Sequence, residues 1–161
     1  MSDQAPPVPT YFHCAPIELG PGSIINPGNW GRIFDLYEAQ PGSGLPTNVF
    51  KEALLEQARL LYAPQKPSRL ASAFACLTLP EAIAFRNKHQ KTNIIYEVRP
   101  TVPNPNMHLG DYELSIAPYP PRYFQSMLDQ PRDYWMKPAT SNLEILLECP
   151  VQIVAMVDRP I

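Results

Sequence analysis

Three ionisable side chains stand inside segments that otherwise have the pattern of apolar strands. They are His13 in TYFHCA, Glu97 in NIIYEVR and Glu144 in SNLEILLECPVQIV. An ionisable group in an apolar strand must be paired or must serve a ligand, because burying an unpartnered charge is costly. Taken singly, each also fits a hydrogen-bonded core histidine or an outward-facing carboxylate. The Gly, Pro and Asn run that follows His13 favours a strand that ends at a ligand.

Cys14 directly follows His13, and such a pair suggests a thiol nucleophile activated by an imidazole. Adjacent strand residues point to opposite faces of a sheet, so we do not expect His13 to activate Cys14. The three cysteines have no CxxC spacing, and the three histidines have no recognised metal-ligand spacing. The sequence therefore predicts reduced thiols, no disulfide framework and no metal.

The composition limits the kinds of partner and compartment. A net charge of −2 argues against a nucleic acid held by bulk electrostatics. No stretch of about 18 apolar residues occurs, so no membrane span is expected. The start MSDQAPPVPT lacks a basic segment followed by an apolar one. We expect a cytoplasmic protein, or one exported or injected by a route without a signal peptide.

Proline is unusually frequent, with 21 in 161 residues. The prolines are scattered among aromatic and aliphatic residues, which indicates long ordered loops rather than a disordered tail. Residues 1–10 are predicted to be a Pro-rich arm, and residues 11–161 a single domain. Its class is predicted to be α+β, with a mostly antiparallel sheet and a few short helices.

The elements that must position the polar residues follow from hydrophobic periodicity and turn signals. Strands are predicted at Thr10–Cys14, Ser72–Leu77, Asn93–Arg99, Leu143–Leu147 and Val151–Val157. Helices are predicted at Asn48–Tyr62, after a Thr78/Glu81 capping box to about Lys88, and at Pro121–Leu128. The first helix is expected to bury Phe50, Leu54, Ala58 and Leu61. Residues 20–44 and most of 100–122 are expected to be loops.

Several of these segments resemble the rifampin ADP-ribosyltransferases. Three segments are similar, in the same order, to that family's aromatic-x-His strand, its Thr-Leu-acid-Ala-Ala helix and its Ile-x-x-Val-x-Pro strand. They are YFHCAPIELGPGSIINPG, FACLTLPEAIAF and NIIYEVRP. Phe74 and Phe85, with ten residues between them, resemble the Tyr-x10-Tyr pair of the diphtheria-toxin and poly(ADP-ribose) polymerase group. LEILLECPVQIVAMV resembles the late strand that carries the catalytic glutamate of the toxin families. The resemblance implies an ADP-ribosyltransferase-like fold with a split antiparallel sheet.

The resemblance also implies roles for individual residues, with NAD as co-substrate. Glu144 takes the catalytic position, where a carboxylate stabilises the oxocarbenium-like state formed as nicotinamide leaves ribose. His13 binds a ribose hydroxyl, and the backbone of Cys14 binds the nicotinamide amide. Phe74 and Phe85 stack on the cationic nicotinamide ring. Independently of the resemblance, Arg69 or Arg86 is expected to pair the pyrophosphate, because Arg suits bidentate phosphate contacts and both lie near the segments that carry Phe74 and Phe85.

Three positions depart from the family patterns. Phe74 stands where the rifampin enzymes have Tyr, which keeps the stack and removes a hydroxyl. Those enzymes take their acid from a later loop, where this chain offers Asp111, so Asp111 and Glu144 are rival catalytic acids. Asn142 stands two residues before Glu144, where the toxins usually have Glu or Gln, and it can bond an acceptor but cannot act as a base.

The sequence therefore leads to two functional hypotheses. The first is an NAD-dependent mono-ADP-ribosyltransferase, with a possible NAD glycohydrolase side activity, in the setting of a bacterial toxin, effector or modifying enzyme. Its acceptor is unknown and is a protein, a small molecule or a nucleic acid. The second is a domain of the same fold that binds a nucleotide, an RNA end or a protein without transferring ADP-ribose. Oligomeric state is not readable from the sequence.

Overall fold

A computed structural model describes residues 8–36, 42, 47–114 and 123–160, and within these ranges the strands form two antiparallel sheets. The four-stranded sheet has the order β1-β4-β7-β2 and the three-stranded sheet the order β3-β6-β5. The strands are β1 Tyr11–Ala15, β2 Ile24–Ile25, β3 Ala73–Ala75, β4 Ile94–Pro100, β5 Met107–Asp111, β6 Leu143–Leu147 and β7 Val151–Asp158. The α+β class with antiparallel sheets is confirmed.

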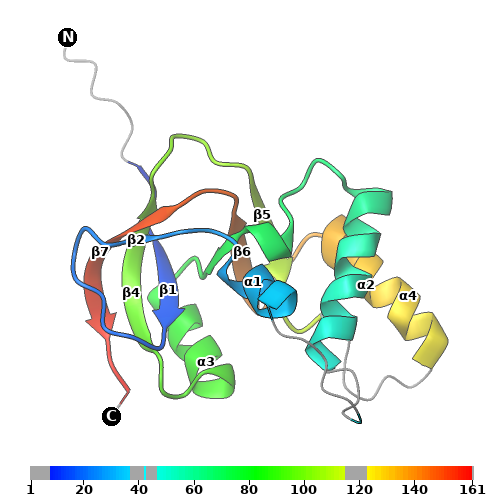
Figure 1. Ribbon diagram of the computed structural model, residues 1–161, viewed down its shortest axis with the longest axis horizontal. Coiled ribbons are helices and arrows are strands. Elements are labelled where there is room, and N and C mark those ends of the chain that lie inside the picture. Colours follow the sequence, from blue (N-terminus) through cyan, green and yellow to red (C-terminus); the bar gives the residue numbers. More distant parts are fainter. Residues whose placement is uncertain (1–7, 37–41, 43–46, 115–122, 161) are drawn as a thin grey trace.

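The helices lie outside the two sheets. They are α1 Asn29–Leu36, α2 Thr47–Tyr62, α3 Leu79–His89 and α4 Tyr123–Met136, with a 3-10 turn η1 at Arg69–Ala71. Figure 1 shows the four-stranded sheet at one end of the molecule and the paired helices α2 and α4 at the other, with the three-stranded sheet between them. The helix α3 packs against β1, and α1 packs against η1.

The core forms because alternate residues of each strand point inward. The inner faces of the two sheets pack on each other, and the largest buried side chains there include Tyr96, Val98, Leu147 and Ile153. The outer face of the three-stranded sheet is covered by α2 and α4, with Trp135 fully buried. The helix α3 covers part of the four-stranded sheet. Three apolar clusters thus hold the strands that carry the predicted site residues.

Most of the predicted elements are confirmed. The strands β1, β3, β4, β6 and β7 and the helix α2 lie within one or two residues of their expected bounds. The helix α3 begins at the expected capping box: the Thr78 hydroxyl accepts from the Glu81 N–H, and Glu81 accepts from the Thr78 N–H at 3.0 Å. Of the predicted N-terminal arm, only residues 8–10 are among the described ones.

Three expectations about local structure are wrong. The loop predicted at 20–44 contains β2 and the helix α1. Residues 100–122 were expected to be mostly loop, and the described ones among them include the short strand β5. The helix predicted at Pro121–Leu128 continues to Met136 with Pro131 inside it, and its first two residues lie outside the described ones. The buried face of α2 carries Glu52, Leu55 and Ala58, whereas Leu61 is 67% exposed.

Candidate functional site

In the described part of the chain, the two sheets meet at the bridge between Phe12 and Cys76 and part directly beside it. Phe12 of β1 and Cys76, which follows β3, exchange both backbone hydrogen bonds, at 2.9 and 2.7 Å. Regular antiparallel pairing would continue with Cys14 and Phe74, two residues along each strand. The carbonyl of Phe74 instead accepts a hydrogen bond from Nδ1 of His13 at 2.6 Å. The His13 side chain therefore occupies the point at which the sheets separate.

This parting directs the backbone of Cys14 into the space between the sheets. Backbone groups of residues two apart in a strand point to the same side. Phe12 uses its N–H and C=O for Cys76, on the side away from β4, so the N–H and C=O of Cys14 point to that side as well. A donor and an acceptor thus stand together at a strand end, as a primary amide ligand requires.

The protonation of His13 follows from its partner. A carbonyl only accepts hydrogen bonds, so Nδ1 must carry the proton. Burial lowers the pKa of His13 below its usual value of 6.5, and the ring is therefore neutral at pH 7. Its Nε2 then presents a lone pair, which suits a ligand hydroxyl as donor.

Glu144 lies on β6 opposite Gly110 of β5 and points toward the layer formed by α2 and α4. Its Oε1 accepts from Nη1 of Arg69 and, at 2.8 Å, from the hydroxyl of Tyr134 on α4. Gly110 makes room for this arrangement, because a Cβ there would lie 2.5 Å from the Tyr134 ring. The carboxylate is 6% exposed, so its contacts are poorly screened by solvent.

Arg69 joins this carboxylate to a second one. Its Nε donates to Oε2 of Glu52 at 2.9 Å and its Nη2 to Oε1 at 3.1 Å, while Nη1 donates to Glu144 and Tyr134. Its guanidinium carbon lies 5.0 Å from the ring centre of Phe74 and 5.1 Å from that of Tyr134. Burial opposes its charge, but Glu144, Tyr134 and Glu52 outweigh burial and raise the pKa of Arg69 well above its ordinary value.

We call Glu52, Arg69, Tyr134 and Glu144 the Arg69 cluster. Sequence reasoning found Arg69 and Glu144 but missed Glu52 and Tyr134, which come from α2 and α4. Trp30 of α1 supports the cluster, since its Nε1–H donates to Oε1 of Glu52 at 2.9 Å. The available signal was that Glu52, Leu55 and Ala58 recur at helical spacing, so that Glu52 shares the face buried by two apolar residues.

The predicted aromatic pair lies in two different clusters. Phe74 is half-buried and packs on the cluster that holds Leu146 and Trp135. Phe85 packs beside α3, with its ring centre 5.1 Å from that of Tyr112 and 5.2 Å from that of His89. Phe74 lies on β3, one of the two strands that part, and Phe85 lies on α3, the helix that follows β3 in the sequence. Their joint stacking on nicotinamide stays a prediction.

Asp111 does not share a face with Glu144. Asp111 pairs in register with Leu143, one residue away from Glu144, and adjacent strand residues point to opposite faces. Its carboxylate accepts from the Glu113 N–H at 2.9 Å and from the Ser141 hydroxyl at 3.2 Å. These bonds hold the turn after β5, so the two rival acids could not serve one site together.

Asn142 and Arg86 also occupy structural positions. Asn142 is exposed at a turn with φ of 48°, a conformation that Asn tolerates better than most residues. Its carbonyl accepts from the Tyr112 N–H at 3.0 Å. Arg86 is buried and forms an ion pair with Asp158 at the end of β7. Their predicted roles toward an acceptor and a pyrophosphate stay predictions.

The thiols beside the parting are not activated. Burial raises the pKa of Cys14 to about 11 and that of Cys76 to about 12. The Cys14 thiol faces the Ala82 carbonyl of α3 at 3.9 Å, whereas His13 faces Phe74. This agrees with the expectation that His13 does not activate Cys14.

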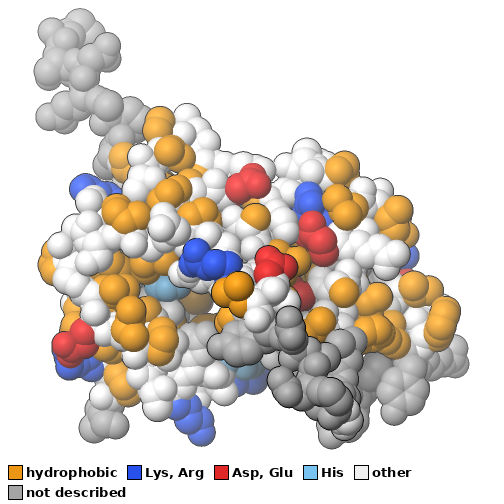
Figure 2. All heavy atoms as spheres, viewed as in Figure 1, with side chains coloured by type: hydrophobic (Ala, Val, Ile, Leu, Met, Phe, Trp, Pro, Cys, Tyr) orange, Lys and Arg blue, Asp and Glu red, His pale blue; other side chains and the backbone are white. Residues whose placement is uncertain are grey.

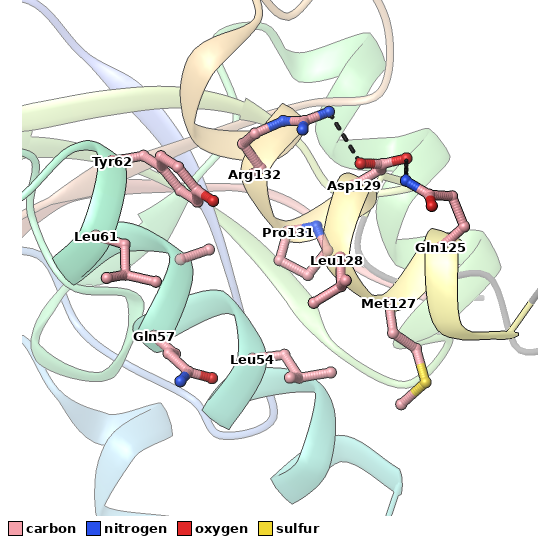
Figure 3. Close-up of a pocket in the computed structure, with 11 residues that line it drawn as sticks. Leu54, Gln57, Leu61, Tyr62, Gln125, Met127, Leu128, Asp129, Pro131 and Arg132 are labelled. Carbon is pink, nitrogen blue, oxygen red and sulfur yellow. Dashed lines mark hydrogen bonds and ion pairs between the residues drawn. The ribbon is translucent and has the colours of Figure 1, made fainter.

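A separate groove runs between α2 and α4 (Figure 3). Leu54 and Leu61 of α2 and Met127 and Leu128 of α4 line it, with an ion pair between Asp129 and Arg132 at its rim. None of the predicted site residues is among those lining the groove. Figure 2 shows basic side chains scattered singly over the face that carries α1, rather than gathered in one patch.

A comparison with protein-family models matches residues 30–159, from α1 to β7. The chain belongs to the family described as "Protein of unknown function (DUF2441)". The match covers the whole Arg69 cluster of this DUF2441 chain and leaves β1, with His13 and Cys14, outside. No curated protein matches the chain.

Two further findings concern this DUF2441 chain within its described residues. No helix there is long and apolar enough to cross a membrane. In the same part of the chain, no group of three or more His, Cys, Asp or Glu side chains is arranged to hold a metal ion.

Proposed function

We propose that this chain is an NAD-dependent mono-ADP-ribosyltransferase with an ADP-ribosyltransferase-like fold. The observation that carries the proposal is the parting of the two sheets beside the Phe12–Cys76 bridge. The His13 imidazole, the Cys14 backbone on the side of β1 away from β4 and the β3 strand that carries Phe74 meet there. These groups offer what a nicotinamide nucleoside needs: a hydroxyl acceptor, an amide donor and acceptor, and an aromatic ring.

In the proposed reaction, the bond between ribose C1′ and the nicotinamide nitrogen breaks, and its electron pair leaves with nicotinamide. Positive charge develops on the ribose, and the carboxylate of Glu144 stabilises it. A ribose hydroxyl donates to Oε2 of Glu144, because Oε1 already accepts from Arg69 and Tyr134. The acceptor nucleophile then bonds to C1′ and loses its proton to solvent water. With water as acceptor, the same steps give NAD glycohydrolase activity.

In this proposal, Arg69 does not bind the pyrophosphate of NAD while it keeps its present contacts. The guanidinium of Arg69 is 6% exposed and donates to two carboxylates and a hydroxyl. Lys51, one residue before Glu52 on α2, is a half-buried cation on the same side of the helix as Leu55. Burial and the charge of Arg69 lower the pKa of Lys51.

A second candidate function is a nucleotide-, RNA-end- or protein-binding domain of the same fold. It is favoured by the pairing of Glu144 with Arg69 inside the protein, since a paired and buried carboxylate also suits a purely structural role. Phe74, which lacks the hydroxyl of Tyr, points the same way. This candidate predicts NAD or nucleotide binding without loss of nicotinamide.

The experiment that tests the proposal is release of nicotinamide from NAD by the purified chain. We expect wild-type release to fall by about 10²-fold or more in Glu144→Gln, because one charge-stabilising group is lost. His13→Ala should raise the KM for NAD by about tenfold, the worth of one hydrogen bond. Glu56→Gln is the matched control, since Glu56 is a carboxylate on α2 that pairs with Arg59 and is not part of the Arg69 cluster.

The possible outcomes separate the hypotheses. Loss of release in Asp111→Asn together with full release in Glu144→Gln would make Asp111 the acid. NAD binding by calorimetry without nicotinamide release would favour the binding domain. If the protein neither binds NAD nor releases nicotinamide, the transferase and a dinucleotide-binding domain are both contradicted, and an RNA-end- or protein-binding domain of the same fold is left.

A further inference from the structure

The Arg69 cluster contains one more carboxylate than it has cations. Arg69 carries one positive charge, and Glu52 and Glu144 each carry a negative charge when ionised. Glu52 is 2% exposed and Arg69 and Glu144 are each 6% exposed, so water screens these charges weakly. A simple pair of Arg69 with Glu144 would be neutral, whereas the cluster as built keeps a net negative charge.

The geometry gives the two carboxylates different tasks. Glu52 takes the Nε and Nη2 edge of the guanidinium through both of its oxygens, and its Oε1 is itself held by the Trp30 N–H. This contact fixes the plane of the Arg69 fork. The remaining Nη1 then points at Glu144 and at the Tyr134 hydroxyl. Among the hydrogen bonds of the described residues, none joins Glu52 to Glu144 directly, and Arg69 bonds both.

A purely structural role of the Arg69–Glu144 pair does not require the additional carboxylate of Glu52. Buried ion pairs are often no more stabilising than apolar residues of the same volume, because desolvation offsets their attraction. An additional buried carboxylate adds desolvation cost and repels Glu144. It does, however, give the four residues of the cluster more negative than positive charge when both carboxylates are ionised, and an excess of negative charge favours a developing positive charge on ribose.

We propose that Glu52 is a positioning residue that acts through Arg69 to hold the Glu144 carboxylate in place and to keep it from being neutralised. This inference rests on the proposed function of Glu144. Glu52 is not expected to touch the substrate. Its loss should therefore slow the chemical step and leave substrate binding nearly unchanged.

The test is nicotinamide release by the full chain carrying Glu52→Gln, Glu144→Gln or both. Glu52→Gln should lower kcat by about tenfold or more with the KM for NAD within about twofold of wild type, the pattern of an interaction made only in the transition state. In the Glu144→Gln background, Glu52→Gln should cost almost nothing further, because residues that act as a unit are not additive. Glu52→Asp, which keeps the charge, should recover part of the loss.

The controls separate a positioning role from a structural one. Glu56→Gln, one turn along α2 from Glu52, should keep the wild-type kcat. If Glu52→Gln does not fold, Glu52→Asp replaces it in the double-mutant comparison. Losses that add fully in the double variant, or an unchanged kcat in Glu52→Gln, would overturn the inference while leaving the proposed function standing. Absence of release by wild type would overturn both.

Discussion

At the scale of single residues, the Arg69 cluster depends on a position without a side chain. Gly110 lies opposite Glu144 in the β5–β6 ladder, and the Tyr134 ring fills the space that a Cβ would occupy. Glu144 would otherwise lose the hydroxyl that shares its Oε1 with Arg69. His108, also on β5, packs against the same helix, α4: its ring stacks on that of Trp135, with 4.9 Å between the ring centres.

His108 should make the stability of the protein depend on pH. Burial, together with Lys66, lowers the pKa of His108 from 6.5 to about 4. As pH falls from 6.5 toward 4, the unfolded chain binds a proton that the folded chain does not, so the free energy of unfolding falls. The expected slope is about 1.4 kcal/mol per pH unit, or roughly 3 kcal/mol over this window. His13, whose pKa is also lowered, adds in the same direction.

Urea denaturation at a series of pH values measures this dependence. His108→Gln should flatten the slope between pH 6.5 and 4, because the titrating group is removed while an amide can still donate to the Tyr134 carbonyl. His89→Gln is the control, since His89 is exposed on α3. An equal slope in wild type and His108→Gln would show that His108 does not carry the effect.

At the scale of elements, the helix α1 connects the cluster to the segment before β3. Gly31 of α1 lies against the backbone of Leu70 in η1, and a Cβ there would stand 2.1 Å from the Leu70 carbonyl oxygen. The preceding residue, Trp30, donates to Glu52, and the residue before Leu70 is Arg69. Close approach of α1 to η1 therefore sets two members of the Arg69 cluster at once.

Gly31→Ala should consequently destabilise the protein and loosen the cluster. The new methyl group meets backbone rather than a movable side chain, so α1 must shift, at an expected cost of about 1–3 kcal/mol or more. Thermal unfolding measures this cost. Gly20→Ala is the matched control, because a Cβ at Gly20 meets nothing within 4 Å and should change stability by less than about 0.5 kcal/mol. A Gly31→Ala variant as stable as Gly20→Ala would contradict the tight α1–η1 contact.

These contacts explain why the elements were easier to predict than the site. The strands β6 and β7 have clear apolar runs broken by Cys149-Pro150, and α3 has a capping box, so local signals sufficed. The helix α1 has only eight residues, and its Gly31 weakens the helical pattern for a tertiary reason.

The face of α2 was misassigned for a related reason. The helix α2 has more apolar residues than the fold buries. Phe50 and Leu61 therefore predict the wrong buried face, and that face places Glu52 at the surface. The side chains that donate to Glu52 come from η1 and α1, and no local sequence pattern predicts these contacts. His13 and Glu144 were accessible to sequence reasoning because each breaks an apolar strand.

At the scale of the whole molecule, the two sheets share one core and are joined through the Phe12–Cys76 bridge. The bridge brings β1 beside β3, and β3 pairs with β6, so residues 13, 74 and 144 come from strands that are neighbours across the parting. A ligand held there would contact both sheets. Its binding should therefore stabilise the folded molecule as a whole rather than one loop.

NAD should raise the melting temperature of wild type. At a concentration about 100 times its Kd, a ligand that binds only the folded state adds about 2.7 kcal/mol, or roughly 5–10 °C for a chain of this size. ATP shares the adenine and phosphates but lacks nicotinamide, so a much smaller shift with ATP would assign recognition to the parting beside His13. Equal shifts with both would favour a general nucleotide-binding domain. No shift at millimolar NAD would contradict a dinucleotide site between the sheets, because a ligand that binds the folded state there must raise the melting temperature.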